Sequence, residues 1–352
     1  MAAKSVWVGL DVGADQMAVC CTDAAGKVLL ESVVPSTATA FHELFKCKRR
    51  RIRLISMESG SSAIPLTRSL RRLGYRVAVF NSRQASRFLA IRQNKTDRND
   101  ARGLAELARF RPDSVSEVRI KTPECQRLRS TLVTRQRLVS IRCTAEGSIR
   151  SLFRLNGGRL KNSSSVAAFK RNVASELRAI KRHAKVDLTE DIKPLLQLSE
   201  AIRTYIKGLD EKLLKAAEDH PICRSFLDIS GVGPICALSF YSTVEDAARF
   251  NRNADIGPYL GMVPIVRQSE QSASKRRISK RGDAMTRSYL TNSAVHHLRH
   301  GSSSLTDWGR QLVERAGKRR AHVAVARKLA VIMIAMWKSG DRYDPHHRSQ
   351  TP

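Results

Sequence analysis

Residues 6–34 read VWVGLDVGADQMAVCCTDAAGKVLLESVV, and this stretch decides the fold of the first part of the chain. Along residues 6–12 aliphatic side chains alternate with other residues, which is the period of a strand with one buried face. Asp11 belongs to the second set, so it projects from the face opposite the aliphatic one. Two more strands are expected at residues 17–22 and 28–34. The chain therefore opens with three antiparallel strands.

Helical and strand patterns alternate after these strands. We expect a helix through Phe41, Leu44 and Phe45, a strand at 52–57, a helix through Leu66, Leu70 and Leu73, a strand at 76–80, and a helix from about Thr96 through Ala108. Three antiparallel strands followed by alternating helices and strands is the element order of an RNase H-like α/β fold. Residues 1–120 are therefore expected to form such a domain.

Residues 121–220 are poor in glycine, and their apolar residues recur at helical spacing. The pattern predicts two long helices that form an antiparallel or coiled-coil insertion, interrupted by NGG at 156–158 and SSS at 163–165. Helices of this length extend beyond a single small core, so we expect their apolar stripes to pair between protomers of a dimer or tetramer. A mainly α-helical third domain is expected at residues 221–340, and a polar tail at 341–352.

The charge balance indicates a polyanionic partner. Lys and Arg number 63 against 32 Asp and Glu, a formal net charge of +31, and nucleic acid is the usual partner of so basic a protein. No run approaches the ~20 apolar residues of a membrane span. The N-terminus lacks the apolar segment of a signal peptide, so we expect a cytoplasmic, nucleoid-associated protein without a membrane partner.

Cysteine and histidine do not suggest a metal site. Seven cysteines without a CxxC pair fit a reducing compartment rather than disulfides or zinc. His296, His297 and His300 lack Cys or carboxylate partners at ligand spacing. We expect these histidines at a helix end that faces solvent or nucleic acid.

Four acidic residues need an explanation in so basic a chain. Asp11 lies mid-strand between two glycines, and Glu58 closes the strand at residues 52–57. Asp97 and Asp100 lie three residues apart and so share one helix face. Taken singly, each has an ordinary explanation as a turn residue, a strand-end charge or Asp in a first helical turn. Together they match the layout of an RNase H metal site, which predicts bound Mg2+, with Mn2+ as an alternative.

Seven motifs occur in a fixed order along nearly the whole chain. The first part holds GLDVGAD, MESG and KTDRNDARGLAELAR, and the last part holds ISGVGPICAL, RFNRNADIGPYLGMVP, RRISKRGDAMTR and KRRAHVAVARKLAVIMIAMW. Together they resemble the transposases of the insertion sequence one-ten family, eleven-eleven subgroup, prokaryotic enzymes described as bridge-RNA-guided recombinases. The resemblance implies a RuvC-like domain whose DEDD set is Asp11, Glu58, Asp97 and Asp100, followed by a C-terminal transposase domain.

The resemblance also implies a serine nucleophile similar in role to that of serine recombinases. In this family the serine follows the GLxP-type segment by a few residues, and counting on from Pro264 places it at Ser269. The family usually has glycine after that serine, whereas Glu270 stands here, and Ser272 and Ser274 lie close enough to be alternatives. A serine hydroxyl needs activation. No His/Asp partner is recognisable nearby, so we expect the carboxylates and their metals to be brought to it.

Ser230-Gly231-Val232-Gly233-Pro234 resembles the hairpin of a helix-hairpin-helix element. Gly231 and Gly233 there would let backbone N–H groups meet a phosphate at a helix N-terminus, although an ordinary tight turn is the alternative. Four cations beside the predicted serine are expected to hold phosphates or to form a solvated charge run: Arg276, Arg277, Lys280 and Arg281.

These observations predict a recombinase that cuts DNA by attack of Ser269 on a phosphodiester while magnesium assists strand transfer. The resemblance further implies a structured guide RNA that pairs with donor and target DNA, so that base pairing selects the sequence. Two alternatives stay open. One is a hydrolytic nuclease that resembles a Holliday-junction resolvase, in which Ser269 is incidental, and the other is a non-catalytic nucleic-acid-binding relative.

Overall fold

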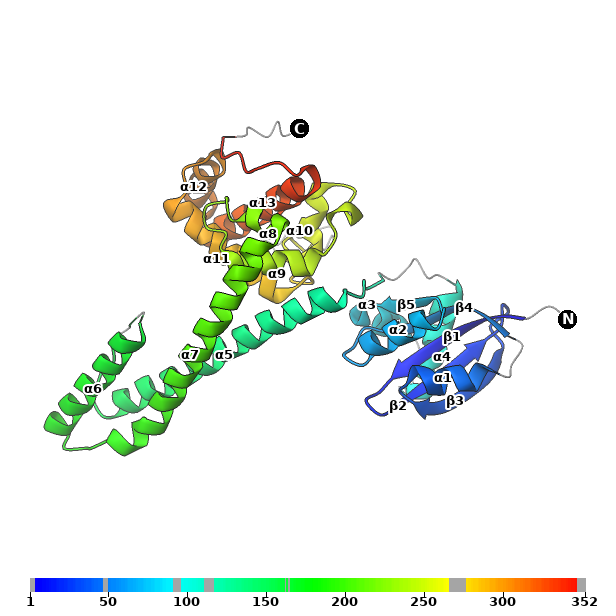
Figure 1. The fold of residues 1–352 in the computed structure, drawn as a ribbon, viewed down its shortest axis with the longest axis horizontal. Helices are drawn as coiled ribbons and strands as arrows, with labels where there is room; N and C mark the ends of the chain where they lie inside the picture. Colours follow the sequence, from blue (N-terminus) through cyan, green and yellow to red (C-terminus); the bar gives the residue numbers. More distant parts are fainter. Residues whose placement is uncertain are drawn as a thin grey trace, which may run out of the picture. The chain divides into compact units, whose positions relative to one another are not determined.

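A five-stranded mixed sheet lies at the centre of the first of two compact units in the computed structural model (Figure 1). The structure describes residues 4–46, 50–90, 96–110, 117–161, 163, 165–265 and 277–346. Most contacts between residues lie within one of two units, Met1–Lys121 and Thr122–Pro352. Each unit has a hydrophobic core of its own.

The strand order in the sheet is β3-β2-β1-β4-β5. The strands are β1 (Lys4–Val12), β2 (Gln16–Thr22), β3 (Val28–Pro35), β4 (Arg50–Glu58) and β5 (Val77–Phe80). β2 is antiparallel to both β1 and β3, whereas β4 runs parallel to β1 and β5 runs parallel to β4. The prediction of an α/β first part and a mainly helical remainder is confirmed.

Helices cover both faces of this sheet. α1 (Ala38–Lys46) and α2 (Ala63–Arg72) pack on the aliphatic face, whose core includes Val6, Val8 and Leu10 of β1. α3 (Ser82–Leu89) and α4 (Asp97–Phe110) pack on the opposite face, against Leu54 and Phe80. The sequence pattern did not predict α3.

Small residues let α4 lie directly on the strands. A Cβ added at Gly9 would come within 2.0 Å of the Ala101 carbonyl oxygen, so this position requires glycine. Ala18 of β2 is buried against the same helix. On β4, the Ser56 hydroxyl donates to the carbonyl oxygen of Leu104 over 2.8 Å. The face that carries Asp11 is therefore the one that α4 covers.

The second unit consists of a long helical hairpin and a helical core. Its helices are α5 (Pro123–Leu155), α6 (Val166–His183), α7 (Thr189–Asp219), α8 (Pro221–Phe226), α9 (Pro234–Val244), α10 (Ile256–Tyr259), α11 (Ala284–His300), α12 (Ser304–Ala316) and α13 (Lys318–Ser339), with short 3-10 turns at Ala247–Arg249 and Asn253–Asp255. No helix among the described residues is long and apolar enough to cross a lipid bilayer.

α5 and α7 lie antiparallel along one another. Arg135 of α5 forms an ion pair with Asp210 of α7, and further along α5 the Glu146 carboxylate accepts a hydrogen bond from Ser199. α6 lies at the far end of this pair (Figure 1). The sequence predicts two long helices here, whereas the structure has three, because the glycine and serine break is followed by a separate helix.

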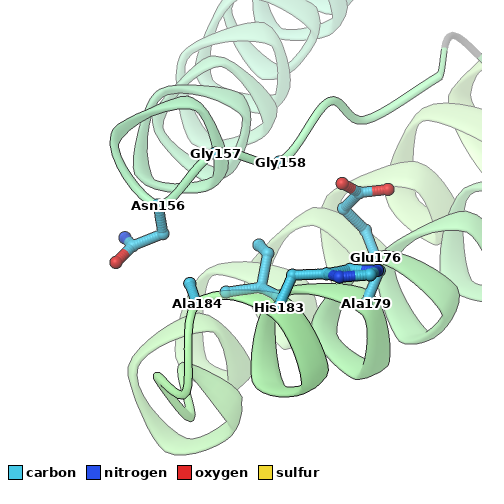
Figure 2. A pocket seen from close by; sticks show the side chains of 8 residues that line it. Asn156, Gly157, Gly158, Glu176, Ala179, His183 and Ala184 are labelled. Atoms are coloured by element: carbon cyan, nitrogen blue, oxygen red, sulfur yellow. The ribbon is translucent and has the colours of Figure 1, made fainter.

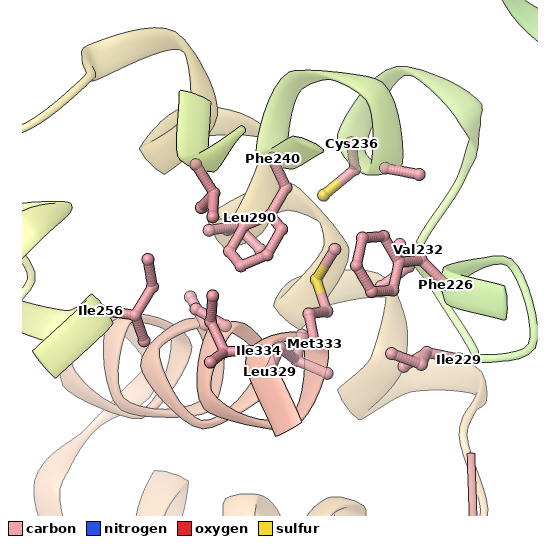
Figure 3. Packing of buried hydrophobic residues seen from close by; sticks show 14 of the residues in the cluster. Phe226, Ile229, Val232, Cys236, Phe240, Ile256, Leu290, Leu329, Met333 and Ile334 are labelled. Atoms are coloured by element: carbon pink, nitrogen blue, oxygen red, sulfur yellow. The ribbon is translucent and has the colours of Figure 1, made fainter. Parts of the chain in front are cut away.

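The core of the second unit forms where α8, α9, α11 and α13 meet. Figure 3 shows Phe226, Phe240 and Met333 packed together there. Leu132 of α5 and Leu213 of α7 belong to the same buried cluster. The base of the hairpin is therefore part of this core, and the apolar stripes of α5 and α7 meet within one chain.

Candidate active site

The predicted carboxylates Asp11 and Glu58 lie at the carboxyl ends of neighbouring parallel strands. Leu10 of β1 pairs with Met57 of β4, so Asp11 and Glu58 follow at the same level. Glu58 in turn pairs with Phe80, the last residue of β5. Both acidic residues are partly buried. The carboxyl ends of parallel strands are where α/β proteins commonly place their sites.

The direction of α4 brings Asp97 and Asp100 to the same edge of the sheet. Arg109, near the end of α4, donates to the carbonyl oxygen of Ala24 over 3.0 Å, in the turn between β2 and β3. That turn lies at the amino end of β1, whereas Ala101 lies over mid-strand Gly9. α4 therefore runs antiparallel to β1, and its first turn lies near the carboxyl end of that strand.

Thr96 caps α4 and orients its first turn. Its hydroxyl accepts a hydrogen bond from the Asn99 N–H over 3.2 Å, and its carbonyl oxygen accepts one from the Asp100 N–H over 2.9 Å. Asp97 is exposed and Asp100 is partly buried. Negatively charged side chains in a first turn interact favourably with the positive end of the helix dipole, so Asp97 and Asp100 stabilise α4 even without a bound metal.

Carboxylate oxygens at this edge are the donors that Mg2+ prefers. Within the described part of the chain, however, no three His, Cys, Asp or Glu side chains come close enough together to hold a metal ion. The backbone thus brings four acidic residues to one edge, but their side chains as they stand do not form a ligand set. We call this group, which consists of Asp11, Glu58, Asp97 and Asp100, the carboxylate edge.

The predicted nucleophile lies outside the described residues, within 266–276. The same applies to three other residues near it in the sequence, Ser272, Ser274 and Arg276. On either side of this segment the chain is held together: Pro264 and Ile278 form an antiparallel bridge, and the Ser279 N–H donates to the carbonyl oxygen of Val263 over 2.8 Å.

Beside this bridge the two chain segments that contain Gly261 and Gly282 cross in close contact. Gly261 has a φ of +68°, and a Cβ there would come within 2.6 Å of the Arg281 nitrogen. A Cβ on Gly282 would come within 2.2 Å of the Tyr259 carbonyl oxygen. Arg287 of α11 also donates to the Gly282 carbonyl oxygen over 3.1 Å. The two chain segments that flank 266–276 are therefore fixed against each other.

Arg277, Lys280 and Arg281 are exposed beside this crossing. Lys280 has a φ of +54°, a backbone conformation that non-glycine residues seldom adopt. Exposed guanidinium and ammonium groups on a fixed backbone suit contacts with phosphate.

A partly buried polar network behind the crossing was not predicted from the sequence. Asp283 caps α11 by accepting the Thr286 N–H over 2.8 Å, and its second oxygen forms an ion pair with Arg129 of α5. Arg129 also donates to the Thr243 hydroxyl over 2.7 Å. Burial raises the pKa of Asp283, but the Thr286 N–H and the Arg129 guanidinium outweigh that effect and lower it. The spacing of Asp283 and Thr286 signals a helix cap, whereas nothing local indicates Arg129.

The two glycines of the predicted hairpin have different surroundings. Gly231 has a φ of +86°, and a Cβ there would come within 2.6 Å of the Ser293 carbonyl oxygen on α11. Gly233, directly before α9, has no atom within 4 Å of such a Cβ and is exposed. The fold therefore requires Gly231, whereas Gly233 leaves the start of α9 open to a ligand.

His297 corrects one expectation from the sequence, because its side chain is buried rather than exposed at a helix end. Its Nδ1–H donates to the Ser230 carbonyl oxygen over 2.7 Å, and its Nε2 lies 3.0 Å from the Ser303 hydroxyl. Burial lowers the pKa of His297, which favours the neutral ring. This histidine ties the hairpin to α11, while His296 and His300 are exposed.

A pocket of about 330 Å3 opens between the turn after α5 and helix α6 (Figure 2). Its carboxylate, Glu176, accepts a hydrogen bond from the Arg159 N–H over 2.7 Å. The lining residues are Asn156, Gly157, Gly158, Glu176, Ala179, Ile180, His183 and Ala184. None of the predicted site residues lines it.

Both parts of the chain are similar to known transposases. A family model described as "Transposase" matches residues 8–155, which include the carboxylate edge. A second, described as "Transposase IS116/IS110/IS902 family", matches residues 223–308, which include the hairpin and the segment 266–276.

Individual relatives are similar over most of their length. The chain is 28% identical to the transposase for insertion sequence element IS1111A of Coxiella burnetii, over 96% of this chain and 90% of that protein. It is 28% identical to a probable family 20 transposase of Pseudomonas aeruginosa, over 83% and 86%. It is 25% identical to the transposase for insertion sequence element IS1328 of Yersinia enterocolitica, over 95% and 97%.

Proposed function

The chain belongs to the IS116/IS110/IS902 family of transposases, and from this we infer that it cuts and rejoins DNA through a serine–phosphodiester intermediate. In this proposal Ser269 is the nucleophile and the carboxylate edge holds Mg2+, with Mn2+ as an alternative. A structured bridge RNA selects the donor and target DNA. The enzyme is a dimer or tetramer of this chain, and it binds and recombines DNA in the nucleoid.

The convergence of the carboxylate edge is the observation that carries the proposal. Asp11 and Glu58 follow a paired position on parallel strands, and α4 runs back over the sheet so that Asp97 and Asp100 reach the same edge. The strand order β3-β2-β1-β4-β5, antiparallel first and parallel afterwards, supports assignment to the RNase H-like, and more narrowly RuvC-like, fold. Mg2+ held there would stabilise charge on a phosphate oxygen.

The chemistry assigned to Ser269 conserves the phosphodiester bond energy. The serine Oγ–H gives up its proton as Oγ attacks phosphorus, the bond between phosphorus and one deoxyribose oxygen breaks, and that oxygen leaves as a hydroxyl. The strand is then held as a serine phosphodiester. Attack by the hydroxyl of another DNA end reverses the step and restores the serine, so rejoining needs no further energy source.

The hairpin and the cations near 266–276 would position the DNA backbone. Gly233 leaves the start of α9 accessible, and Arg277, Lys280 and Arg281 are exposed. Arg276 is included among these DNA-contacting residues because it directly precedes Arg277 in the sequence. Gly231 is included because its positive φ shapes the hairpin. Such contacts set register and affinity, while base pairing with the RNA would set sequence choice.

Trapping the intermediate tests the nucleophile. DNA nicked so that the leaving fragment diffuses away is expected to give a protein–DNA band that survives denaturant and disappears with protease. Ser269→Ala removes this band, whereas Ser272→Ala and Ser274→Ala keep it. Free nicked DNA without an adduct would instead identify a hydrolytic nuclease, and an adduct at Ser272 would move the nucleophile.

Substitution at the carboxylate edge tests the metal. Asp11→Asn and Asp97→Asn are expected to abolish recombination and to keep the circular dichroism of the wild type, because each removes a ligand charge but keeps the shape of the side chain. Thermal unfolding of Asp97→Asn should shift only by the helix-dipole contribution of one charge, about 0.3–1 kcal/mol. Recombination at the wild-type rate by either variant contradicts the assignment.

Removal of the RNA tests guidance. Binding measured with and without matched RNA is expected to show target preference only when RNA is present. Equal selectivity of the protein alone contradicts a guided mechanism.

A further inference from the structure

A cluster of three arginines surrounds one buried carboxylate in the helical hairpin. Glu146 of α5 has a side chain only 7% exposed, and one of its oxygens accepts hydrogen bonds from Arg203 of α7 over 2.6 and 3.1 Å and from Ser199 over 3.1 Å. Arg142 lies 3.7 Å from the same oxygen, and Arg150 lies 3.6 Å from the other. We call Arg142, Arg150 and Arg203 the arginine cluster.

The arginine cluster has more positive charge and more donors than its carboxylate can satisfy. Three guanidinium groups face the one negative charge of Glu146. Glu200 of α7 forms an ion pair with Lys170 over 3.3 Å, and its buried Oε1 has no hydrogen-bond partner among the described residues. Each guanidinium has five N–H donors, whereas a carboxylate accepts about four hydrogen bonds in all. Among the described residues, the Nε atoms of Arg142 and Arg150 are buried without a hydrogen-bond partner.

Two of the three arginines are open to a ligand. The Arg203 side chain is 9% exposed and is committed to Glu146, whereas those of Arg142 and Arg150 are each 27% exposed. The Phe169 ring of α6 lies beside the cluster, 5.3 Å from the Arg203 guanidinium carbon and 5.9 Å from that of Arg150. Arg142 and Arg150 therefore lie at a packed junction of α5, α6 and α7 with their Nε atoms buried and the rest of their side chains partly exposed.

We propose that Arg142 and Arg150 bind a phosphate group over Glu146, and that the backbone of a nucleic acid supplies this phosphate. A tetrahedral oxyanion with a full negative charge suits two forked guanidinium groups and compensates the surplus charge. The assignment to nucleic acid rests on the proposed function, whereas phosphate binding itself does not. A buried ion network that only fixes the register of α5 and α7 would need no added anion.

Thermal unfolding of the full chain in inorganic phosphate tests the site. At constant ionic strength, set with chloride, the wild-type midpoint is expected to rise with the logarithm of phosphate concentration. The double variant Arg142→Gln/Arg150→Gln loses this rise. The control Arg178→Gln/Arg182→Gln removes the same charge from positions on α6 outside the cluster and keeps it. A wild-type midpoint that does not respond to phosphate overturns the site.

Glu146→Gln keeps the proposal testable if the double arginine variant fails to fold. Removing the carboxylate removes the competitor for the guanidinium donors, so the phosphate-induced rise in midpoint is expected to be larger than in wild type. A smaller rise, or none, contradicts the proposal, because a purely structural network only weakens when its carboxylate is removed.

Binding to a short DNA duplex, followed by fluorescence anisotropy at several salt concentrations, tests the source of the phosphate. Removing the two arginines is expected to make the slope of log K against log salt shallower by roughly 0.9 for each DNA phosphate that they neutralise in the wild type. A phosphate response together with an unchanged slope overturns the nucleic-acid assignment and leaves free phosphate as the ligand. Neither measurement uses transposition, so failure here is distinct from failure of the proposed function.

Discussion

At the scale of single residues, Gly9 is the position where helix and strand touch. We expect Gly9→Ala to destabilise the first unit by about 1–3 kcal/mol or more, because the added methyl meets backbone atoms of Ala101 and Ala105 that cannot move aside easily. Chemical unfolding measures the change. Gly60→Ala is the matched control, since no atom lies within 4 Å of its added methyl, and a comparable loss of stability there would contradict this account.

His297 makes stability depend on pH. Burial lowers its folded-state pKa below the ordinary value of 6.5, so the unfolded chain takes up a proton first as the pH falls. The free energy of unfolding is therefore expected to fall below about pH 6.5, by up to about 1.4 kcal/mol per pH unit from this group, until the pH reaches the folded-state pKa.

Substitution separates His297 from the other histidines. The pKa values of His220 and His322 are also lowered, first by burial, so His297→Gln should reduce the slope of stability against pH without abolishing it. His296→Gln, at an exposed position on the same helix, is the control and should keep the wild-type slope. Equal slopes for wild type and His297→Gln would contradict this account, because they would show that the ring takes up a proton as readily in the folded state as in the unfolded chain.

At the scale of elements, the hairpin before α9 separates a folding role from a binding role. Gly231→Ala is expected to cost at least about 1–2 kcal/mol, because its φ of +86° is unfavourable for a side chain and the methyl meets the Ser293 carbonyl oxygen. Gly233→Ala should change stability by less than about 0.5 kcal/mol yet weaken DNA binding several-fold. Wild-type DNA affinity for Gly233→Ala would remove the hairpin from the interface.

The strands of the first unit were predictable because their pattern is local. The alternation of aliphatic and other residues along 6–12 indicates a strand with one buried face, and this can be recognised without knowing the rest of the chain. α3 was not predicted, because Ser82–Leu89 offers few apolar residues and its burial depends on contact with α4. α6 was merged with the long helices, because its apolar residues continue the same helical spacing.

The sequence predicts where the acidic residues lie on their strands and helix, but not the surroundings of their side chains. Following the strand alternation placed Glu58 at the end of a strand and Asp11 within one, and in the structure β1 continues only one residue beyond Asp11. How closely their side chains approach one another depends on packing that no local pattern encodes. The same holds for Arg129, whose partner Asp283 is 154 residues away, and for the burial of His297.

At the scale of the whole molecule, we expect that cutting the chain between Lys121 and Thr122 gives two fragments that fold, whereas cutting it before residue 221 does not give an equally stable fragment. Fragments 1–121 and 122–352 are each expected to show a cooperative thermal transition, because each has its own core. A fragment 221–352 lacks Leu132 and Leu213, and the absence of each is expected to cost about 2–5 kcal/mol. Calorimetry of the three fragments checks this, and an equally stable 221–352 would contradict it.

The helical hairpin also acts as a lever. At 1.5 Å per residue, the part of α5 beyond Leu132 spans about 35 Å, so a tilt of about 5° at Leu132 moves the far end of the helix by about 3 Å. Because Leu132 and Leu213 fix the joined end, any torque applied at α6 is transmitted to the helices of the core. A macromolecule bound at the far end of the hairpin can therefore shift the packing of Leu132 and Leu213 in the core with a smaller force than one bound beside the core.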